Sequence, residues 1–126
     1  MSINIPVSIG ELFDKYSILE IKHMKIKNHI KLTHIKKELD FLKQYIQKYN
    51  LDIKIYYELK NINLELWEIE DQLRNKEKLQ IFDDTFIQLA RNVYFTNDKR
   101  AEIKKNINII FKSEIVEIKD YVNYKL

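Results

Sequence analysis

The apolar positions of the chain recur at helical spacing in successive stretches. The first series is spaced by four, three, four, three and four residues, at Leu12, Tyr16, Leu19, His23, Ile26 and Ile30. A second series follows in a new phase, at Leu32, Ile35, Leu39, Leu42, Ile46 and Tyr49. Because residues three and four positions apart share one face of an α-helix, both series predict amphipathic helices. The change of phase predicts a turn near residues 27–32, and one continuous helix with a stutter is the alternative.

Two further helices are predicted in the second half of the chain. The third helix covers residues 51–78, with apolar positions at Ile55, Leu59, Ile62, Leu66, Ile69 and Leu73. The fourth begins near Asp83 or Asp84, either of which can cap a helix N-terminus. Its apolar face is interrupted by the polar run Thr96–Arg100 and is formed by Phe86, Leu89, Ala90, Val93, Ile103, Ile107 and Ile110. Either the helix breaks there, with Asn97 capping a new helix, or these polar groups face a polar pocket.

The two ends of the chain carry weaker patterns. Residues 1–7 look extended, and Ser8 with Glu11 has the S-x-x-E form of a capping box. The single glycine, Gly10, lies inside this box and is expected to permit close backbone packing. Residues 113–126 are predicted as a short helix or a short strand, and a strand there could pair with residues 3–7.

These elements predict an all-α fold, an antiparallel bundle of four or five helices with a short extended segment at the N- or C-terminus. The length of 126 residues fits a single helical domain, residues 1–126. One glycine and one proline leave too few turn residues for a sandwich or a barrel. Without cysteine, disulfide scaffolds, cysteine-based metal sites and thiol catalysis are excluded. No apolar run has the length of a membrane span, and no signal-peptide pattern begins the chain, so a cytoplasmic location is expected.

The amino-acid composition changes how the charges are interpreted. Ile, Lys and Asn make up 51 of 126 residues, which indicates an A/T-rich coding bias. The net charge of +3 comes with only three arginines, whereas nucleic-acid surfaces usually favour Arg. Where a lysine suffices this chain uses lysine, so Arg74, Arg91 and Arg100 are candidates for positions that need a planar guanidinium.

The arginines define the predicted ligand site. If the third and fourth helices face each other, the guanidinium groups can converge with carboxylates and an aromatic side chain. Such a site could hold a carboxylate, a phosphate or a sugar. The alternative is a buried ion-pair network that fixes the helix register. The candidate residues are Trp67, Glu70, Asp71, Arg74, Arg91, Tyr94, Asn97, Asp98, Arg100 and Lys104.

A basic stretch, Lys22–Lys37, holds six lysines and all three histidines without an acid. On the turn of a helical hairpin it would form a positive tip able to meet phosphates. A solvated charged tip is the simpler interpretation, because no aromatic residue is interleaved for base stacking. The acids of the third helix, Glu58, Glu65, Glu68, Glu70 and Asp71, could also offset this charge within the fold or across a dimer.

Two sets of side chains in the sequence are candidates for metal ligands, the histidines and the paired carboxylates. His23, in the apolar series, is expected to be a core histidine, and His23, His29 and His34 lack the spacing of a ligand pair. Four E-x-x-E/D pairs between residues 65 and 120 could hold Mg²⁺ on facing helices. The long gap between the pairs and the ease with which they arise on a solvated helix favour the simpler interpretation. We therefore predict no metal or other cofactor and keep Mg²⁺ as an alternative.

Four strings of the chain, taken in this order, resemble a small bacterial and viral domain family of unknown function: PVSIGELFDKYSILEIK, LWEIEDQLR, FDDTFIQLARNVYFTNDKRAEIKKNIN and SEIVEIKDY. The resemblance covers residues 5–121 and implies a compact single domain. It also implies an association with surface-glycan genes, although its motifs belong to no known chemistry. The basic stretch departs from the more mixed charge of that family.

The function predicted from these observations is a small non-catalytic binding or interaction protein, accessory to surface-glycan assembly. The expected partners are a second copy of the chain and an anionic small molecule or nucleotide sugar. One alternative is a metal- or arginine-dependent enzyme that acts on a phosphorylated or anionic small molecule. Another is nucleic-acid binding through Lys22–Lys37, which the scarcity of arginine disfavours. No membrane association is expected.

Overall fold

The computed structural model describes residues 1–126 and contains four helices and no strand. Their bounds are α1 (Ile9–Lys25), α2 (His29–Ile46), α3 (Ile53–Leu79) and α4 (Asp84–Ile110). The predicted all-α bundle is therefore confirmed, with four helices. None of the four has the length and apolar content that a membrane span requires.

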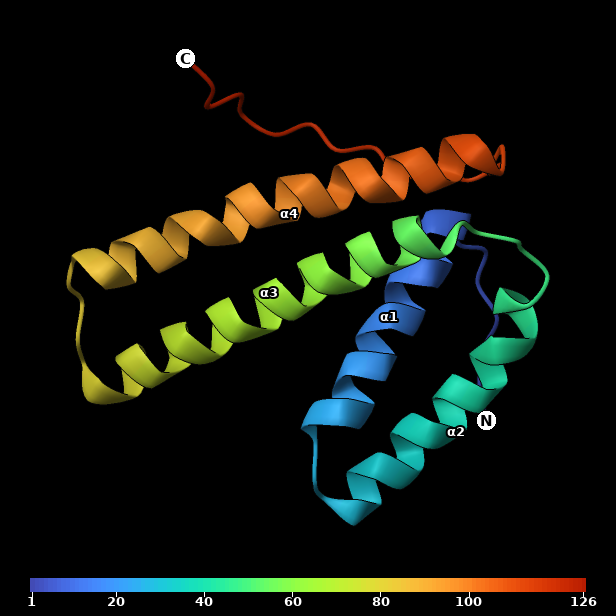
Figure 1. Cartoon of the computed structure of the whole chain (residues 1–126), viewed down its shortest axis with the longest axis horizontal. Helices are drawn as coiled ribbons and strands as arrows, with labels where there is room; N and C mark the ends of the chain where they lie inside the picture. Colours follow the sequence, from blue (N-terminus) through green and yellow to red (C-terminus); the bar gives the residue numbers. More distant parts are fainter.

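The helices form two antiparallel hairpins, and α1 joins them. α3 and α4 run side by side along the longest axis, and the α1–α2 hairpin lies obliquely across one half of this pair (Figure 1). α1 contacts each of the other three helices, whereas α2 lies against α1 and against neither α3 nor α4. α1 is thus the element that connects the two halves of the core.

Polar caps define where the helices begin. The Ser8 hydroxyl accepts from the Glu11 N–H at 3.1 Å, and the Asn28 side chain accepts from the Lys31 N–H at 3.0 Å. Asp83 is the N-cap of α4. The break at residues 26–28 confirms the predicted turn between the first two helices and excludes the continuous helix. The Glu11 carboxylate does not complete a capping box but binds Lys104 of α4.

The core consists of two small apolar clusters. One joins α1, α3 and α4 through Phe13, Leu59, Ile103 and Ile107. The other joins α1 and α2 through Leu19, Ile35 and Leu39. Every residue of the second cluster belongs to the predicted apolar series, and so do Leu59, Ile103 and Ile107 in the first.

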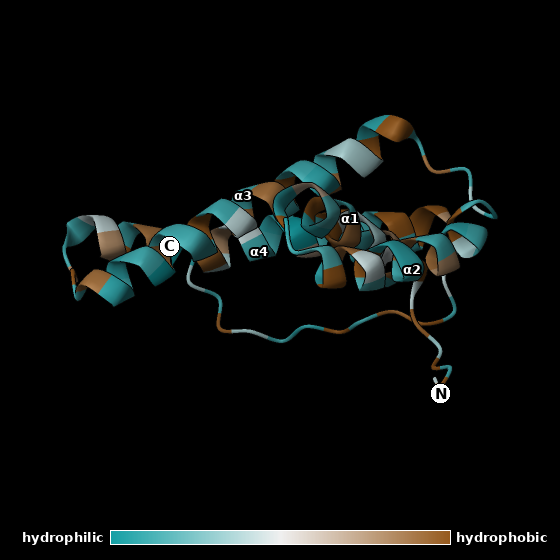
Figure 2. Cartoon of the chain, turned by 90° about the horizontal axis from the view of Figure 1, so that it is seen from below, coloured by the Kyte–Doolittle hydropathy of each residue, from teal (hydrophilic) through white to brown (hydrophobic).

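The far half of the α3–α4 hairpin extends beyond α1 and α2 (Figure 2). Within this arm, Ile69 of α3 and Leu89 of α4 are buried. Large apolar side chains at and near its tip are exposed: Leu79, Ile81, Phe82 and Ile87. The arm therefore has one buried seam, and its outer faces have no helical neighbour in the chain.

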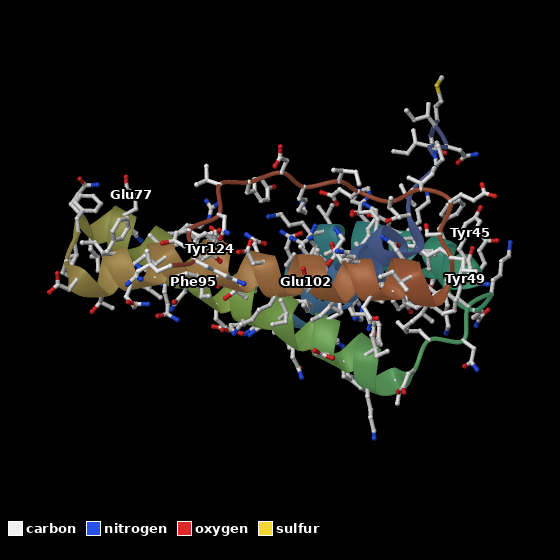
Figure 3. The ribbon with its side chains drawn as sticks, turned by 90° about the horizontal axis from the view of Figure 1, so that it is seen from above. Tyr45, Tyr49, Glu77, Phe95, Glu102 and Tyr124 are labelled. Carbon is white, nitrogen blue, oxygen red and sulfur yellow. The ribbon has the colours of Figure 1, made fainter.

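Three details differ from the predictions or decide between them. α4 is uninterrupted from Asp84 to Ile110, so the polar run 96–100 is not a break and its groups must find polar surroundings. His23 is exposed and is not a core histidine. Ile21 is almost fully buried, and a residue two positions away lies about 200° around the helix axis, which places His23 towards solvent. Residues 114–126 form neither helix nor strand and run along the bundle as an extended tail (Figure 3).

Candidate functional site

A buried carboxylate lies where α1, α3 and α4 meet. Asp14 of α1 is 0% exposed. Its Oδ1 accepts from Arg100 Nε of α4 and from Asn63 Nδ2 of α3, each at 2.9 Å, while its Oδ2 accepts from a terminal nitrogen of Arg100. The guanidinium thus binds both carboxylate oxygens, the geometry that makes arginine–carboxylate pairs strong and directional. A charge this deeply buried is tolerated only with such partners.

The partners of Asp14 keep it ionised. Burial raises the pKa of Asp14, but the hydrogen bonds from Arg100 and Asn63 and the charges of Arg100 and Lys104 outweigh it, so the pKa lies below its ordinary value. The hydrogen bond to Asp14 raises the pKa of Arg100. Asp14 and Arg100 therefore form an ion pair in any neutral buffer.

Lys104 continues this network one helical turn after Arg100. Its side chain is only 10% exposed, and its Nζ lies 2.7 Å from Glu11, 3.5 Å from Asp14 and 3.4 Å from Glu117 of the tail. Burial lowers the pKa of Lys104, but the hydrogen bond to Glu11 and the charges of Asp14 and Glu11 outweigh it and raise the pKa overall. The ammonium group is consequently held charged between α1 and the tail.

Small and polar residues let α4 approach α1 closely. The Gly10 N–H donates to Asn108 Oδ1 at 2.7 Å, and a Cβ added at Gly10 would lie 2.5 Å from the Lys104 carbonyl oxygen. About two turns further along α1, the Ser17 hydroxyl accepts from Asn63 of α3 at 2.8 Å and donates to the Asp14 carbonyl at 2.7 Å. The expected role of Gly10 in close packing is confirmed.

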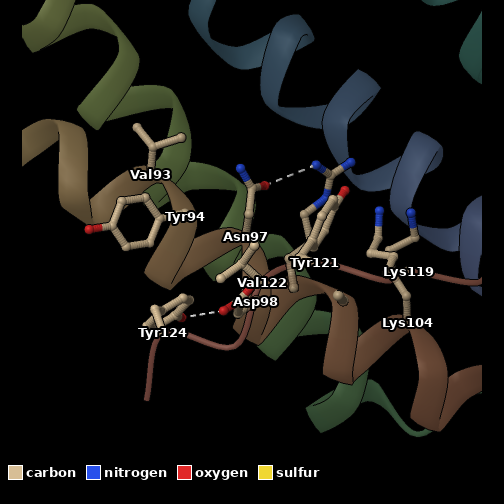
Figure 4. Close-up of a pocket in the computed structure, with 11 residues that line it drawn as sticks. Val93, Tyr94, Asn97, Asp98, Lys104, Lys119, Tyr121, Val122 and Tyr124 are labelled. Carbon is tan, nitrogen blue, oxygen red and sulfur yellow. Dashed lines mark hydrogen bonds between the residues drawn. The ribbon is translucent and has the colours of Figure 1, made fainter. Parts of the chain in front are cut away.

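A pocket of about 600 Å³ lies between α4 and the tail (Figure 4). We call it the tail pocket. Its lining residues are Val93, Tyr94, Asn97, Asp98, Arg100, Ala101, Lys104, Lys119, Tyr121, Val122 and Tyr124. Lys104 and Lys119 stand together at one end, while Tyr124 donates to Asp98 at the other (Figure 4). The pocket is therefore cationic at one end and aromatic and acidic at the other.

The tail that closes this pocket is attached at both ends. At its start, the Ser113 hydroxyl accepts from the Ile9 N–H at 3.2 Å. Near its end, the Tyr124 ring packs against Tyr94 and Phe95 of α4, with ring centroids 5.3 and 5.4 Å apart. Between these attachments, Glu117 is the tail residue that reaches Lys104.

Half of the predicted ligand-site residues are brought together. Tyr94, Asn97, Asp98, Arg100 and Lys104 all line the tail pocket. The guanidinium of Arg100 also donates to Asn97 Oδ1 at 3.5 Å.

The other half lies elsewhere, so the predicted convergence of the three arginines is wrong. The Arg74 side chain is 80% exposed and lies 4.0 Å from Glu70. Arg91 is exposed and contacts Gln88 at 3.4 Å and the Phe95 ring at 5.4 Å. Nine residues along one helix are two and a half turns, so Arg91 and Arg100 project from opposite sides of α4. Trp67, Glu70, Asp71, Arg74 and Arg91 are absent from the lining of the tail pocket.

Sequence reasoning missed the residues that complete the site. Asp14, Ser17 and Asn63 form its buried side, and Glu117, Lys119, Tyr121 and Tyr124 form its tail side. A usable signal was present in α1, because Gly10, Asp14, Ser17 and Ile21 recur at helical spacing beside the apolar series. The tail has no periodicity from which its position could be predicted.

The basic stretch is partly neutralised within the fold. Lys25 pairs with Glu68 of α3 at 2.7 Å. An acid of the third helix therefore offsets part of the basic charge within the fold, which is one of the two predicted arrangements. Lys36 pairs with Asp40 at 2.9 Å. His29 and His34 are exposed. The structure gathers no group of three or more His, Cys, Asp and Glu side chains that could hold a metal ion.

Comparison with known proteins places the chain in a family. A model described as "Family of unknown function (DUF6165)" matches residues 2–124. The chain belongs to this family. The match extends through all four helices and along the tail to residue 124, so the DUF6165 family model covers every lining residue of the tail pocket. Comparisons with curated proteins and with solved structures gave no match.

Proposed function

We propose that this DUF6165 member is a small non-catalytic binding protein whose ligand, an anionic small molecule, occupies the tail pocket. The observation that carries this proposal is the lining of the pocket, where Arg100, Lys104 and Lys119 accompany three tyrosines. Cations bind the anionic group, and aromatic faces offer a platform for a sugar or a base. A volume of about 600 Å³ lies in the range of small-molecule sites.

The proposal includes a cellular setting. The resemblance noted in the sequence implies an association with surface-glycan genes, so we propose an accessory role in surface-glycan assembly at a cytoplasmic location. Sugar acids and nucleotide sugars are then the first ligand classes to examine.

A titration followed by nuclear magnetic resonance tests the proposal. Binding of a nucleotide sugar or a sugar acid in the tail pocket is expected to shift the ring signals of Tyr94, Tyr121 and Tyr124. Lys119→Gln is expected to weaken this binding about three- to fivefold, the upper range for an exposed ion pair. Lys54→Gln is the matched control, since Lys54 is an exposed lysine outside the tail pocket. Unshifted tyrosine signals across the panel would refute the proposal.

The same titration separates the alternatives. An enzyme acting on a phosphorylated compound would release phosphate or pyrophosphate from the ligand when Mg²⁺ is added, whereas a binding protein leaves the ligand intact. Nucleic-acid binding through Lys22–Lys37 would shift signals of the α1–α2 turn instead and would weaken steeply with salt.

Self-association is the remaining proposal, and the arm of α3 and α4 is the surface for it. The outer faces of the arm carry the acids Glu65, Glu70 and Asp71, which complement the exposed lysines of the α1–α2 turn in a second copy. Light scattering at several concentrations measures the oligomeric state, and Phe82→Asp at the exposed tip is expected to favour the monomer.

A further inference from the structure

The two lysines at the cationic end of the tail pocket already bind an anion, the carboxylate of Glu117, which lines the neighbouring pocket that shares Lys104 and Lys119. This group accepts from Lys119 and lies 3.4 Å from Lys104 Nζ. A ligand carboxylate or phosphate in the tail pocket would compete with Glu117 for the same two lysines. The two ammonium groups of this end are therefore already engaged by part of the chain itself.

Glu117 is held less firmly than the other anions of the network. Its side chain is 46% exposed, and it lies in the irregular tail between the attachments at Ser113 and Tyr124. Asp14 and Glu11, in contrast, project from the first turns of α1, and Lys104 lies closer to Glu11, at 2.7 Å. Rotation of the Glu117 side chain releases Lys119 and removes one of the contacts of Lys104 without disturbing a helix.

The charges around this end are balanced in the structure. Three cations, Arg100, Lys104 and Lys119, meet three carboxylates, Asp14, Glu11 and Glu117. When Glu117 moves away, one positive charge is left uncompensated. The site can then neutralise one negative charge, and a second one would have no partner.

The acidic opposite end of the tail pocket also favours a ligand with a single negative charge. Asp98, which accepts from Tyr124, lies at the end of the pocket away from Lys104 and Lys119 (Figure 4). A carboxylate there repels further negative charge but accepts hydrogen bonds from hydroxyl groups. The arrangement suits a ligand with one anionic end and a neutral, hydroxyl-bearing body.

From this geometry we propose that Glu117 is an internal substitute for the ligand, and that the tail pocket binds a singly charged, hydroxyl-bearing compound such as a sugar acid, whose carboxylate displaces Glu117 from Lys104 and Lys119. This inference rests on the proposed function and narrows its ligand class. The pKa of Glu117 is lowered by the hydrogen bond from Lys119 and the charge of Lys104, so a ligand competes with an ionised carboxylate.

The test compares Glu117→Gln with Glu114→Gln. Both residues lie in the irregular tail, and Glu114 forms no ion pair in the structure, so it is the matched control for a lost charge. Dissociation constants are measured by nuclear magnetic resonance for three probes: glucuronate with one charge, glucose with none and glucose 6-phosphate with two.

Glucuronate is expected to bind Glu117→Gln about three- to fivefold more tightly than the wild type, because its carboxylate no longer competes with an exposed ion pair. Glucose affinity is expected to stay unchanged in both variants, and Glu114→Gln is expected to match the wild type throughout. In the wild type, glucuronate is expected to bind more tightly than glucose 6-phosphate.

Contrary results separate the inference from the function on which it rests. Equal glucuronate affinity in Glu117→Gln and Glu114→Gln, with tyrosine shifts in the pocket, would overturn displacement of Glu117 and leave the binding function standing. Tighter binding of glucose 6-phosphate would overturn the single-charge ligand class. If no probe binds either the wild type or Glu117→Gln at millimolar concentration, the inference fails, and the titration with nucleotide sugars decides the proposed function separately.

Discussion

Replacing Arg100 by methionine tests whether the buried ion pair stabilises the fold. Met has a similar length but no charge, so Asp14, at 0% exposure, loses its bidentate partner. Removal of one partner of a buried pair typically costs about 3–5 kcal/mol. Two features reduce this cost: the Arg100 side chain is 27% exposed, and Asn63 at 2.9 Å and Lys104 at 3.5 Å stay beside Asp14. We expect a loss of about 3 kcal/mol at pH 7, which lowers the melting temperature by about 12 °C for a domain of this size.

The pH dependence gives this prediction a second signature. In the wild type the pKa of Asp14 is lowered, so the pair stabilises the fold above the unfolded pKa of about 3.9 and its contribution is lost as the pH falls through the folded pKa. In Arg100→Met, the hydrogen bonds and the charge of Arg100 no longer lower the pKa of Asp14. We therefore expect burial to raise this pKa. Lowering the pH from 7 towards 4 then protonates Asp14 in the variant, which removes the free-energy cost of burying a carboxylate charge without its arginine. The difference in stability between the two proteins should therefore narrow.

Urea unfolding followed by circular dichroism at both pH values measures these free energies. Arg91→Met is the matched control, because Arg91 is an exposed arginine of the same helix. We expect it to change the free energy of unfolding by less than about 0.5 kcal/mol. Equal losses in the two variants would refute a structural role for the pair, and a difference that does not narrow with pH would refute its electrostatic origin.

Two further substitutions probe the same region. Gly10→Ala is expected to lower stability by about 1–3 kcal/mol in thermal unfolding, because the added Cβ would lie 2.5 Å from the Lys104 carbonyl oxygen. A stabilised variant would contradict this expectation, because it would show that α4 can move away from α1 without a loss of stability. Asn63→Asp places a second carboxylate beside Asp14, so a loss of about 2 kcal/mol at pH 7 that shrinks as the pH falls is expected in urea unfolding. A loss independent of pH between 7 and 4 would contradict that reasoning.

The helices could be predicted from sequence because their signals are local. The apolar spacing and the caps at Ser8, Asn28 and Asp83 act within a few residues, so the four helices follow from them. The depth of burial could not be predicted in the same way. The face of α1 that carries Asp14 and Ser17 is more deeply buried than its apolar pattern suggests, because α3 and α4 supply polar partners for it.

The candidate site was predictable only where one helix determines it. Asn97, Arg100 and Lys104 share a face of α4, and the interruption of the apolar pattern there indicated a polar environment correctly. Asp14 is 86 positions away from Arg100, and an acid near the start of a helix is ordinarily explained by the helix dipole. The proposed grouping of Arg74 with Arg91 and Arg100 failed because it assumed a facing geometry that rotation around α4 does not allow.

The separation of Asp14 from Arg100 also constrains how the chain can mature on the ribosome. Translation proceeds at roughly 5–20 residues per second, so the 86 positions between the two residues correspond to about 4–17 seconds. During that interval α1 has been synthesised, but Arg100 and Lys104, the cations that pair with its buried acid, have not. Desolvating the carboxylate alone is unfavourable, so α1 stays hydrated, and the bundle closes only after the last helix has emerged from the exit tunnel.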